Sequence, residues 1–175
     1  NTLILKNIGT FKRKFKDKDK VYFNKLIERF RKIEFFDLDR VIFLDPLSRD
    51  NYINHLGTSS VLLDPLYFGA GNSFHESMVY GTPTVTMPTK FIKSRIVNAA
   101  YIQMEIDNPP VVWNKKEYVE IAIDIANKEN LLEIKKYYQK KAIEKLFNTA
   151  KAGEEFNQIL LNLYQWSFKT LYCIF

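Results

Sequence analysis

The stretch LDPLYFGAGNSFHE, residues 63–76, decides the fold that we predict for this chain. An apolar run over 61–64 leads into it, and the glycine loop Gly69-Ala70-Gly71-Asn72 follows. A helical pattern over 73–80 comes next and stops at Gly81, with Pro83 beyond it. A short apolar strand, a glycine loop and a helix in this order are typical of an α/β domain that binds a ligand at the loop.

Four more apolar runs flank this stretch, at 3–5, 41–44, 84–88 and 111–113. Helical patterns separate or follow them, at 21–36, 49–56, 91–104, 116–126, 131–146 and 152–171. Strands that are apolar throughout are buried on both faces, as in a parallel sheet between helices. We therefore predict an α/β fold with a doubly wound, Rossmann-like parallel sheet of five strands, forming one domain over residues 1–175.

The composition argues against a membrane-spanning, disulfide-bonded or metal-binding protein. The chain has 175 residues, 46% of them hydrophobic, and no apolar run of the roughly 18–20 residues that a membrane span needs. The single cysteine, Cys173, cannot form an internal disulfide, so we expect a cytoplasmic location. The two histidines and this cysteine show no metal-ligand spacing, so we expect no metal site.

The chain carries a net charge of +6, and six basic residues fall in the segment 12–20. Such a cluster is typical either of a nucleic-acid or membrane patch or of a solvated loop. We favour the loop because no nucleic-acid motif accompanies the charge. Nucleic acid is therefore not an expected partner.

The glycine loop is the strongest candidate for chemistry. Its two glycines let the backbone approach a ligand, and the amides of Asn72, Ser73 and Phe74 are expected to point out of the helix start toward an anion. Glu76, one turn further on, suits the two hydroxyls of a ribose. The alternative is structural: Asn72 or Ser73 caps the helix and Glu76 completes a capping box. A dinucleotide site is disfavoured, because the third glycine of that fingerprint is missing and Thr89-Lys90 stand where an acidic residue is expected.

Residues 61–95 resemble the C-terminal catalytic lobe of a family that includes the O-linked N-acetylglucosamine transferases, the plant SPINDLY proteins and bacterial protein N-glucosyltransferases. The residues that carry the resemblance are 63–66, the loop through Ser73, Gly81-Thr82-Pro83-Thr84-Val85-Thr86-Met87-Pro88 and Ser94-Arg95-Ile96, with further matches at 40–43, 117–119 and 146–149. The resemblance implies the donor lobe of a GT-B glycosyltransferase, which binds a UDP-sugar and needs no metal or other cofactor.

Carried over position by position, the resemblance assigns nucleotide-sugar binding to Leu47, Arg49, Tyr52, Gly71, Asn72, Ser73 and Glu76. Leu47 would contact uracil through its backbone, and Tyr52 would stack on it. Two of these positions also have plain interpretations: Arg49 as a surface arginine, and Tyr52 as a helix face packed on the core. His75 is expected to pack rather than to catalyse, and Arg95 either binds a phosphate or anchors a helix.

The family's N-terminal lobe, with its acceptor-side histidine and a phosphate-binding lysine, has no counterpart in this sequence, so we expect no catalytic residue in this chain. The implied function is the donor half of a protein O- or N-glycosyltransferase that uses UDP-N-acetylglucosamine or UDP-glucose. The protein acceptor would be bound through the missing lobe or through repeats. The alternatives are a non-catalytic nucleotide-binding or interaction module and an NADP-dependent Rossmann-like protein.

Overall fold

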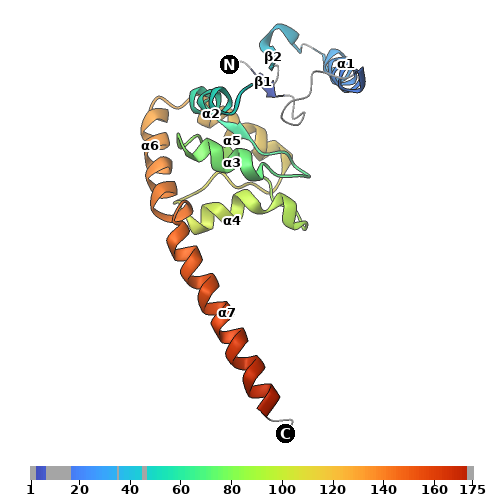
Figure 1. The fold of residues 1–175 in the computed structure, drawn as a ribbon. Coiled ribbons are helices and arrows are strands. Elements are labelled where there is room, and N and C mark those ends of the chain that lie inside the picture. Colours follow the sequence, from blue (N-terminus) through green and yellow to red (C-terminus); the bar gives the residue numbers. More distant parts are fainter. Residues whose placement is uncertain (1–2, 7–16, 35, 45–46, 173–175) are drawn as a thin grey trace. The chain divides into compact units, whose positions relative to one another are not determined.

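The computed structural model describes residues 3–6, 17–34, 36–44 and 47–172. Its contacts divide the chain into two compact units, Asn1–His55 and Leu56–Phe175, which are described separately below (Figure 1). The prediction of one domain over residues 1–175 stays a prediction.

The first unit is built on a pair of parallel strands. β1 (Leu3–Lys6) pairs with β2 (Val41–Leu44) so that Leu3 lies opposite Val41. Between them come helix α1 (Asp17–Arg31) and the short turn η1 (Leu38–Arg40), and α2 (Arg49–Thr58) follows. Helix α1 starts at Asp17, four residues before the predicted residue 21.

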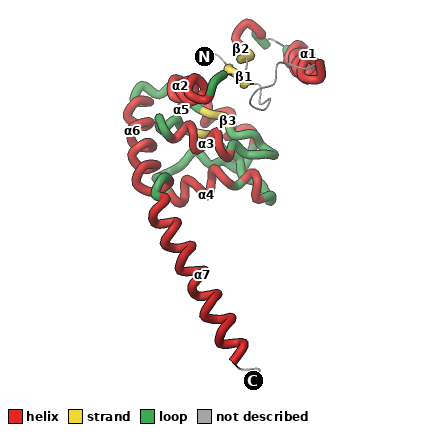
Figure 2. Tube along the Cα trace, viewed as in Figure 1, coloured by secondary structure: helices red, strands yellow, loops and turns green. Residues whose placement is uncertain are grey.

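The second unit is mostly helical (Figure 2). Strand β3 (Leu62–Leu63) leads to α3 (Gly71–Met78), and β4 (Thr84–Val85) leads through the turn η2 (Ile92–Ser94) to α4 (Ile96–Gln103). The remaining elements are α5 (Lys115–Ala126), α6 (Leu131–Lys141), the π-helical turn η3 (Ala142–Leu146) and α7 (Thr149–Tyr172). The predicted helices are therefore confirmed, with boundaries shifted by a few residues.

The predicted five-stranded doubly wound sheet is not what the described residues show. β3 and β4 form a second two-stranded parallel pair, and the predicted strand 111–113 is reduced to one parallel bridge between Thr86 and Val111. Two prolines help to explain the short ladders: Pro83 precedes β4, and Pro110 precedes the bridge. A proline has no N–H to donate, so each one removes a ladder hydrogen bond.

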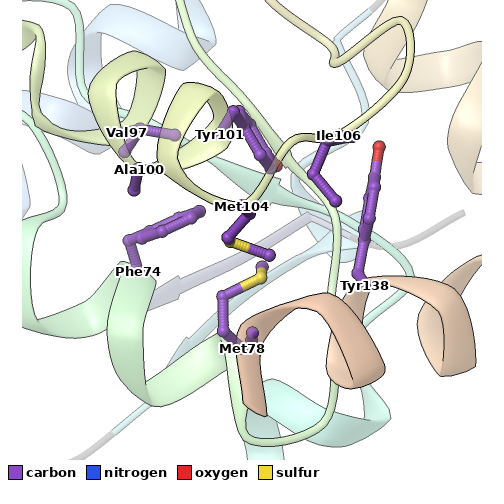
Figure 3. Close-up of a cluster of buried hydrophobic side chains, with 9 residues drawn as sticks. Phe74, Met78, Val97, Ala100, Tyr101, Met104, Ile106 and Tyr138 are labelled. Atoms are coloured by element: carbon purple, nitrogen blue, oxygen red, sulfur yellow. The ribbon is translucent and has the colours of Figure 1, made fainter. Parts of the chain in front are cut away.

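The main core of the second unit lies between α3, α4 and α6 (Figure 3). Phe74 and Met78 project from α3 toward Tyr101 of α4 and Met104, which follows α4, and all four side chains are fully buried. The rings of Phe74 and Tyr101 meet edge to face, with centroids 5.4 Å apart. This packing fixes α3, and therefore the loop in front of it, against α4.

The Tyr101 hydroxyl also holds α4 to β4. It accepts a hydrogen bond from the Thr84 N–H at 2.8 Å and donates one to the Thr84 carbonyl at 2.9 Å. Burial raises the pKa of Tyr101 well above its usual value, so the hydroxyl keeps its proton and can serve both bonds. A smaller core of Val85, Val112, Ala122 and Ile125 joins β4 to α5.

The last helix, α7, extends away from the rest of its unit (Figure 1). Its side chains from Lys151 to Trp166 are exposed, including Phe156, Leu160 and Leu163. No helix in the described part of the chain is both long enough and apolar enough to cross a membrane.

The turn after α3 generates a test of the fold. Gly81 has φ +67°, and a Cβ there would collide with the Lys135 carbonyl of α6. We expect Gly81→Ala to lower the free energy of unfolding by at least about 2 kcal/mol, because alanine adds both left-handed strain and a backbone clash. Denaturant titration followed by circular dichroism measures this.

Gly153→Ala is the matched control. This glycine lies within α7, and a Cβ there meets nothing within 4 Å. Removing a helical glycine is expected to leave stability unchanged or raise it by up to about 1 kcal/mol. Equal stabilities for the two variants would contradict the packing of α6 against Gly81.

Candidate functional site

The glycine loop, defined here as residues 69–73, lies where β3 runs into α3, as predicted. It follows the carboxyl end of a parallel strand, the position at which α/β proteins bind ligands. Its conformation depends on two neighbours: the carboxylate of Asp64 and the backbone of Lys93.

Asp64 ties the loop to the strands. Its Oδ1 accepts a hydrogen bond from the Ala70 N–H at 2.6 Å, and its Oδ2 accepts one from the Thr86 hydroxyl at 2.6 Å. The side chain is buried, with 2% of its surface exposed. Burial raises the pKa of Asp64, while the bonds from Thr86 and Ala70 oppose that rise.

The backbone of Asp64 is held as well. Its N–H donates to the Val85 carbonyl at 3.0 Å, and its carbonyl accepts from the Tyr118 hydroxyl at 2.8 Å. Sequence reasoning treated Asp64 only as the end of a strand and as part of the family resemblance, so this anchor was missed. The available signal was an acidic residue placed directly after an apolar strand, ahead of a glycine loop.

The two glycines have different roles. A Cβ on Gly69 would lie 2.8 Å from the Lys93 carbonyl, which accepts a hydrogen bond from the Gly69 N–H at 2.9 Å. Gly69 is therefore required by close packing. A Cβ on Gly71 would meet only the Ile96 side chain, at 3.6 Å, an ordinary contact. Packing does not require a glycine there, which leaves close approach of a ligand as its predicted role.

The start of α3 settles the structural alternative. The N-cap is Ala70, which has no polar side chain to cap the helix. Asn72 and Ser73 lie inside the first turn, so the alternative in which either of them caps the helix and Glu76 completes a capping box is wrong. The reason is that the hydrogen bond from Ala70 to Asp64 places the helix start two to three residues earlier.

The amides at this helix start are partly used by the protein. The Phe74 N–H donates to the Ala70 carbonyl at 2.8 Å, so the prediction that it points out toward an anion is wrong. The Gly71 N–H donates to the Gly69 carbonyl at 2.9 Å. The Asn72 N–H finds no backbone acceptor in the described part of the chain, and this amide fits the predicted anion site.

Glu76 lies further along α3 and is half-buried. Its carboxylate forms no hydrogen bond or ion pair with another residue in the part of the chain that the structure describes. Asn72 is exposed, and Ser73 is half-buried. The loop and helix therefore bring Gly71, Asn72, Ser73 and Glu76 into one segment of the second unit.

The other three predicted residues belong to the first unit. Arg49 is the exposed first residue of α2, and Leu47 is half-buried ahead of it. Tyr52 has 9% of its surface exposed, which favours packing, the plain interpretation of this residue. Because the two units are described separately, the predicted contacts of Leu47, Arg49 and Tyr52 with a nucleotide stay predictions.

His75 packs as predicted. Its Nδ1 lies 2.8 Å from the Gly71 carbonyl, and its ring meets Phe74 edge to face with centroids 5.6 Å apart. It also lines an open cavity of about 290 Å³ beside α3 and α4. The other lining residues are Ile92, Arg95, Ile96, Ala99, Ala100, Gln103 and Leu146. None of the four predicted residues of the loop and α3 lines this cavity.

Metal binding finds no support in the described residues, where no group of three or more His, Cys, Asp or Glu side chains could hold a metal ion. The pairs of charged side chains here are surface pairs, such as Lys145 with Glu105 at 2.9 Å.

Comparison with known proteins gives a match to solved structures but none at the level of sequence families. No protein-family model and no curated protein sequence matches the chain. A solved structure of a point mutant of the Thermobaculum terrenum O-GlcNAc transferase is similar, with a TM-score of 0.68 and 15% identity. The alignment covers 87% of this chain and 29% of that chain. At this identity the likeness shows the fold alone: the chain has a glycosyltransferase-like fold and spans less than a third of the neighbour's length.

The anchor generates a stability prediction. Asp64→Ala leaves the Ala70 N–H and the Thr86 hydroxyl without their acceptor in a buried place. We expect the free energy of unfolding to fall by about 2–4 kcal/mol, the scale for two unpaired buried groups. Denaturant titration checks this, with Asp124→Ala as control. Asp124 forms only an exposed ion pair with Lys128, so its loss is expected to cost less than about 1 kcal/mol. If both variants lose a similar amount of unfolding free energy, Asp64 does not anchor the loop.

The raised pKa of Asp64 generates a pH prediction. When a folded-state pKa lies above the unfolded one, the stabilising contribution is complete below the unfolded pKa and is lost as pH rises through the folded pKa. Asp64→Asn keeps an acceptor for Ala70 but does not titrate. We expect wild type to lose unfolding free energy relative to Asp64→Asn as the pH rises above about 4, the pKa of an aspartate in the unfolded chain. A constant difference would contradict the burial effect.

Proposed function

We propose that this chain is the donor lobe of a GT-B glycosyltransferase that binds a UDP-sugar on the glycine loop. The observation that carries the proposal is the start of α3, where the N-cap residue Ala70 supplies no side-chain cap, behind a loop anchored by Asp64. Such a helix start offers an unpaired amide and the positive end of the helix dipole to an anion. The glycosyltransferase-like fold supports the same conclusion.

In this proposal the diphosphate lies against Gly71, Asn72 and Ser73. The absence of a side chain on Gly71 lets a phosphate oxygen approach the backbone, and Asn72 adds an exposed amide side chain. Glu76 accepts hydrogen bonds from the ribose hydroxyls, a role supported by its carboxylate having no other partner among the described residues.

The uracil would contact Leu47 and Tyr52, and Arg49 would take the place of a lysine that binds the donor. These assignments rest on the sequence resemblance. The transferred sugar is N-acetylglucosamine or glucose, and the acceptor is a protein. Transfer would proceed in the whole enzyme, where amides and cations stabilise the charge that develops on the departing UDP, without a metal.

Calorimetry on the full chain tests this proposal. UDP, UDP-N-acetylglucosamine, UDP-glucose and NADPH are titrated separately. We expect UDP and at least one UDP-sugar to bind, and NADPH not to bind. A folded chain that does not bind UDP at millimolar concentration would overturn the proposal, and binding of NADPH alone would favour a dinucleotide-binding protein.

Glu76→Ala tests the ribose contact. Loss of a charged hydrogen-bond acceptor is expected to weaken UDP binding by about 1–3 kcal/mol. Glu120→Ala on α5 is the control, because this glutamate forms only an exposed pair with Lys116. If wild type and Glu76→Ala bind UDP with equal affinity, Glu76 does not contact the ribose. That result would not contradict phosphate binding by the glycine loop.

A further inference from the structure

Large apolar side chains are exposed at the end of the second unit where the glycine loop lies. The exposed fractions are 71% for Tyr67, 71% for Phe68, 53% for Phe91 and 85% for Ile92. Lys90 and Lys93 are interleaved with them and are also exposed. We call these six residues the aromatic–basic rim. Burial normally removes such side chains from water, so a cluster of them on the surface marks a site of interaction.

The rim is one surface although its residues come from two segments. The Gly69 N–H donates to the Lys93 carbonyl at 2.9 Å, which joins the loop before α3 to the turn before α4. The Lys93 Nζ lies 5.6 Å from the centre of the Phe68 ring, and the Lys90 Nζ lies 5.4 Å from that of Phe91. Figure 1 shows both segments at the same end of the unit.

Hydrogen bonds of the buried residue Ser94 hold the turn of the rim that carries Phe91. Ser94 has 1% of its surface exposed, and its Oγ donates to the Phe91 carbonyl at 2.8 Å. The same Oγ accepts from the Thr89 N–H at 3.1 Å and lies 2.6 Å from the Thr89 hydroxyl. The Phe91 ring is therefore presented by a hydrogen-bonded turn.

The positive charge of the rim indicates which kind of partner it could bind. Between Pro65 and Met104 the sequence has one acidic residue, Glu76, against Lys90, Lys93 and Arg95. The rim therefore suits an anionic surface. Protein interfaces are depleted in lysine at their centre, whereas membrane-binding surfaces combine phenylalanine and other apolar side chains with lysine. The interleaved lysines favour a lipid surface over a protein partner.

We propose that the aromatic–basic rim docks this unit on the surface of a membrane that contains anionic lipids. Phe68, Phe91 and Ile92 enter the boundary between headgroups and acyl chains, and Lys90 and Lys93 lie among the lipid phosphates. The glycine loop is then held next to the membrane surface. The inference does not depend on UDP binding.

Co-sedimentation with vesicles tests the rim on the full chain. One vesicle preparation is phosphatidylcholine alone, and the other contains about 30% phosphatidylglycerol. We expect binding to the anionic vesicles that weakens with salt, and at least about tenfold weaker binding to phosphatidylcholine. The double variant Phe91→Ser/Ile92→Ser and the double variant Lys90→Gln/Lys93→Gln are each expected to lose about tenfold in affinity for the anionic vesicles.

Ile102→Ser is the matched control, because Ile102 is 70% exposed on α4 but lies outside the rim. It is expected to bind vesicles like wild type. No binding to anionic vesicles would overturn the proposal. So would binding that Phe91→Ser/Ile92→Ser leaves unchanged, the result expected if the basic segment 12–20 alone attracts the lipid. Because Phe91 and Ile92 are outside the nucleotide site, this variant is expected to keep the wild-type affinity for UDP, and the two proposals can therefore fail separately.

Discussion

The second unit depends on one buried carboxylate. One carboxylate oxygen of Asp64 accepts a hydrogen bond from the Ala70 N–H, and the other accepts one from the Thr86 hydroxyl, both at 2.6 Å. The first bond sets where α3 begins, and the second joins the end of β3 to β4. A buried carboxylate is costly unless its lone pairs are occupied, so the loop conformation that occupies them is favoured over others. The position of the glycine loop is thus a consequence of satisfying Asp64.

Local patterns in the sequence were sufficient for the helices. Apolar spacing predicted each helix of the second unit, and Gly81 was correctly predicted to stop α3, since its φ is +67°. The sheet could not be predicted in the same way. Continuous apolar runs indicate burial on both faces, but ladder length depends on which N–H groups are present and aligned. Pro83 and Pro110 remove N–H donors from the ladders, and the burial that the pattern indicated comes instead from helices α4, α5 and α6.

The candidate site was predictable in place but not in detail. A glycine loop after an apolar strand located the helix start, yet the choice of N-cap between Ala70 and Ser73 depends on a hydrogen bond to Asp64 across six residues. No spacing rule contains that bond. For the same reason the Phe74 amide was wrongly expected to face a ligand, because a helix that starts earlier uses it internally. The roles of Leu47, Arg49 and Tyr52 depend on the arrangement of two units, which local patterns do not encode.

The two proposed binding surfaces of the second unit are held by the same contacts. The bond from the Gly69 N–H to the Lys93 carbonyl is also the contact that forbids a side chain at Gly69. The loop that would hold a nucleotide and the turn that carries Phe91 and Ile92 therefore cannot move independently. Phosphate binding at a helix start depends on amides already in place, and insertion of rings into a lipid surface depends on side chains already exposed. A rigid glycine loop and a rigid turn at Phe91 would satisfy both conditions. The hydrogen bonds of Asp64 with Ala70 and of Ser94 with Phe91 restrict the motion of these two segments.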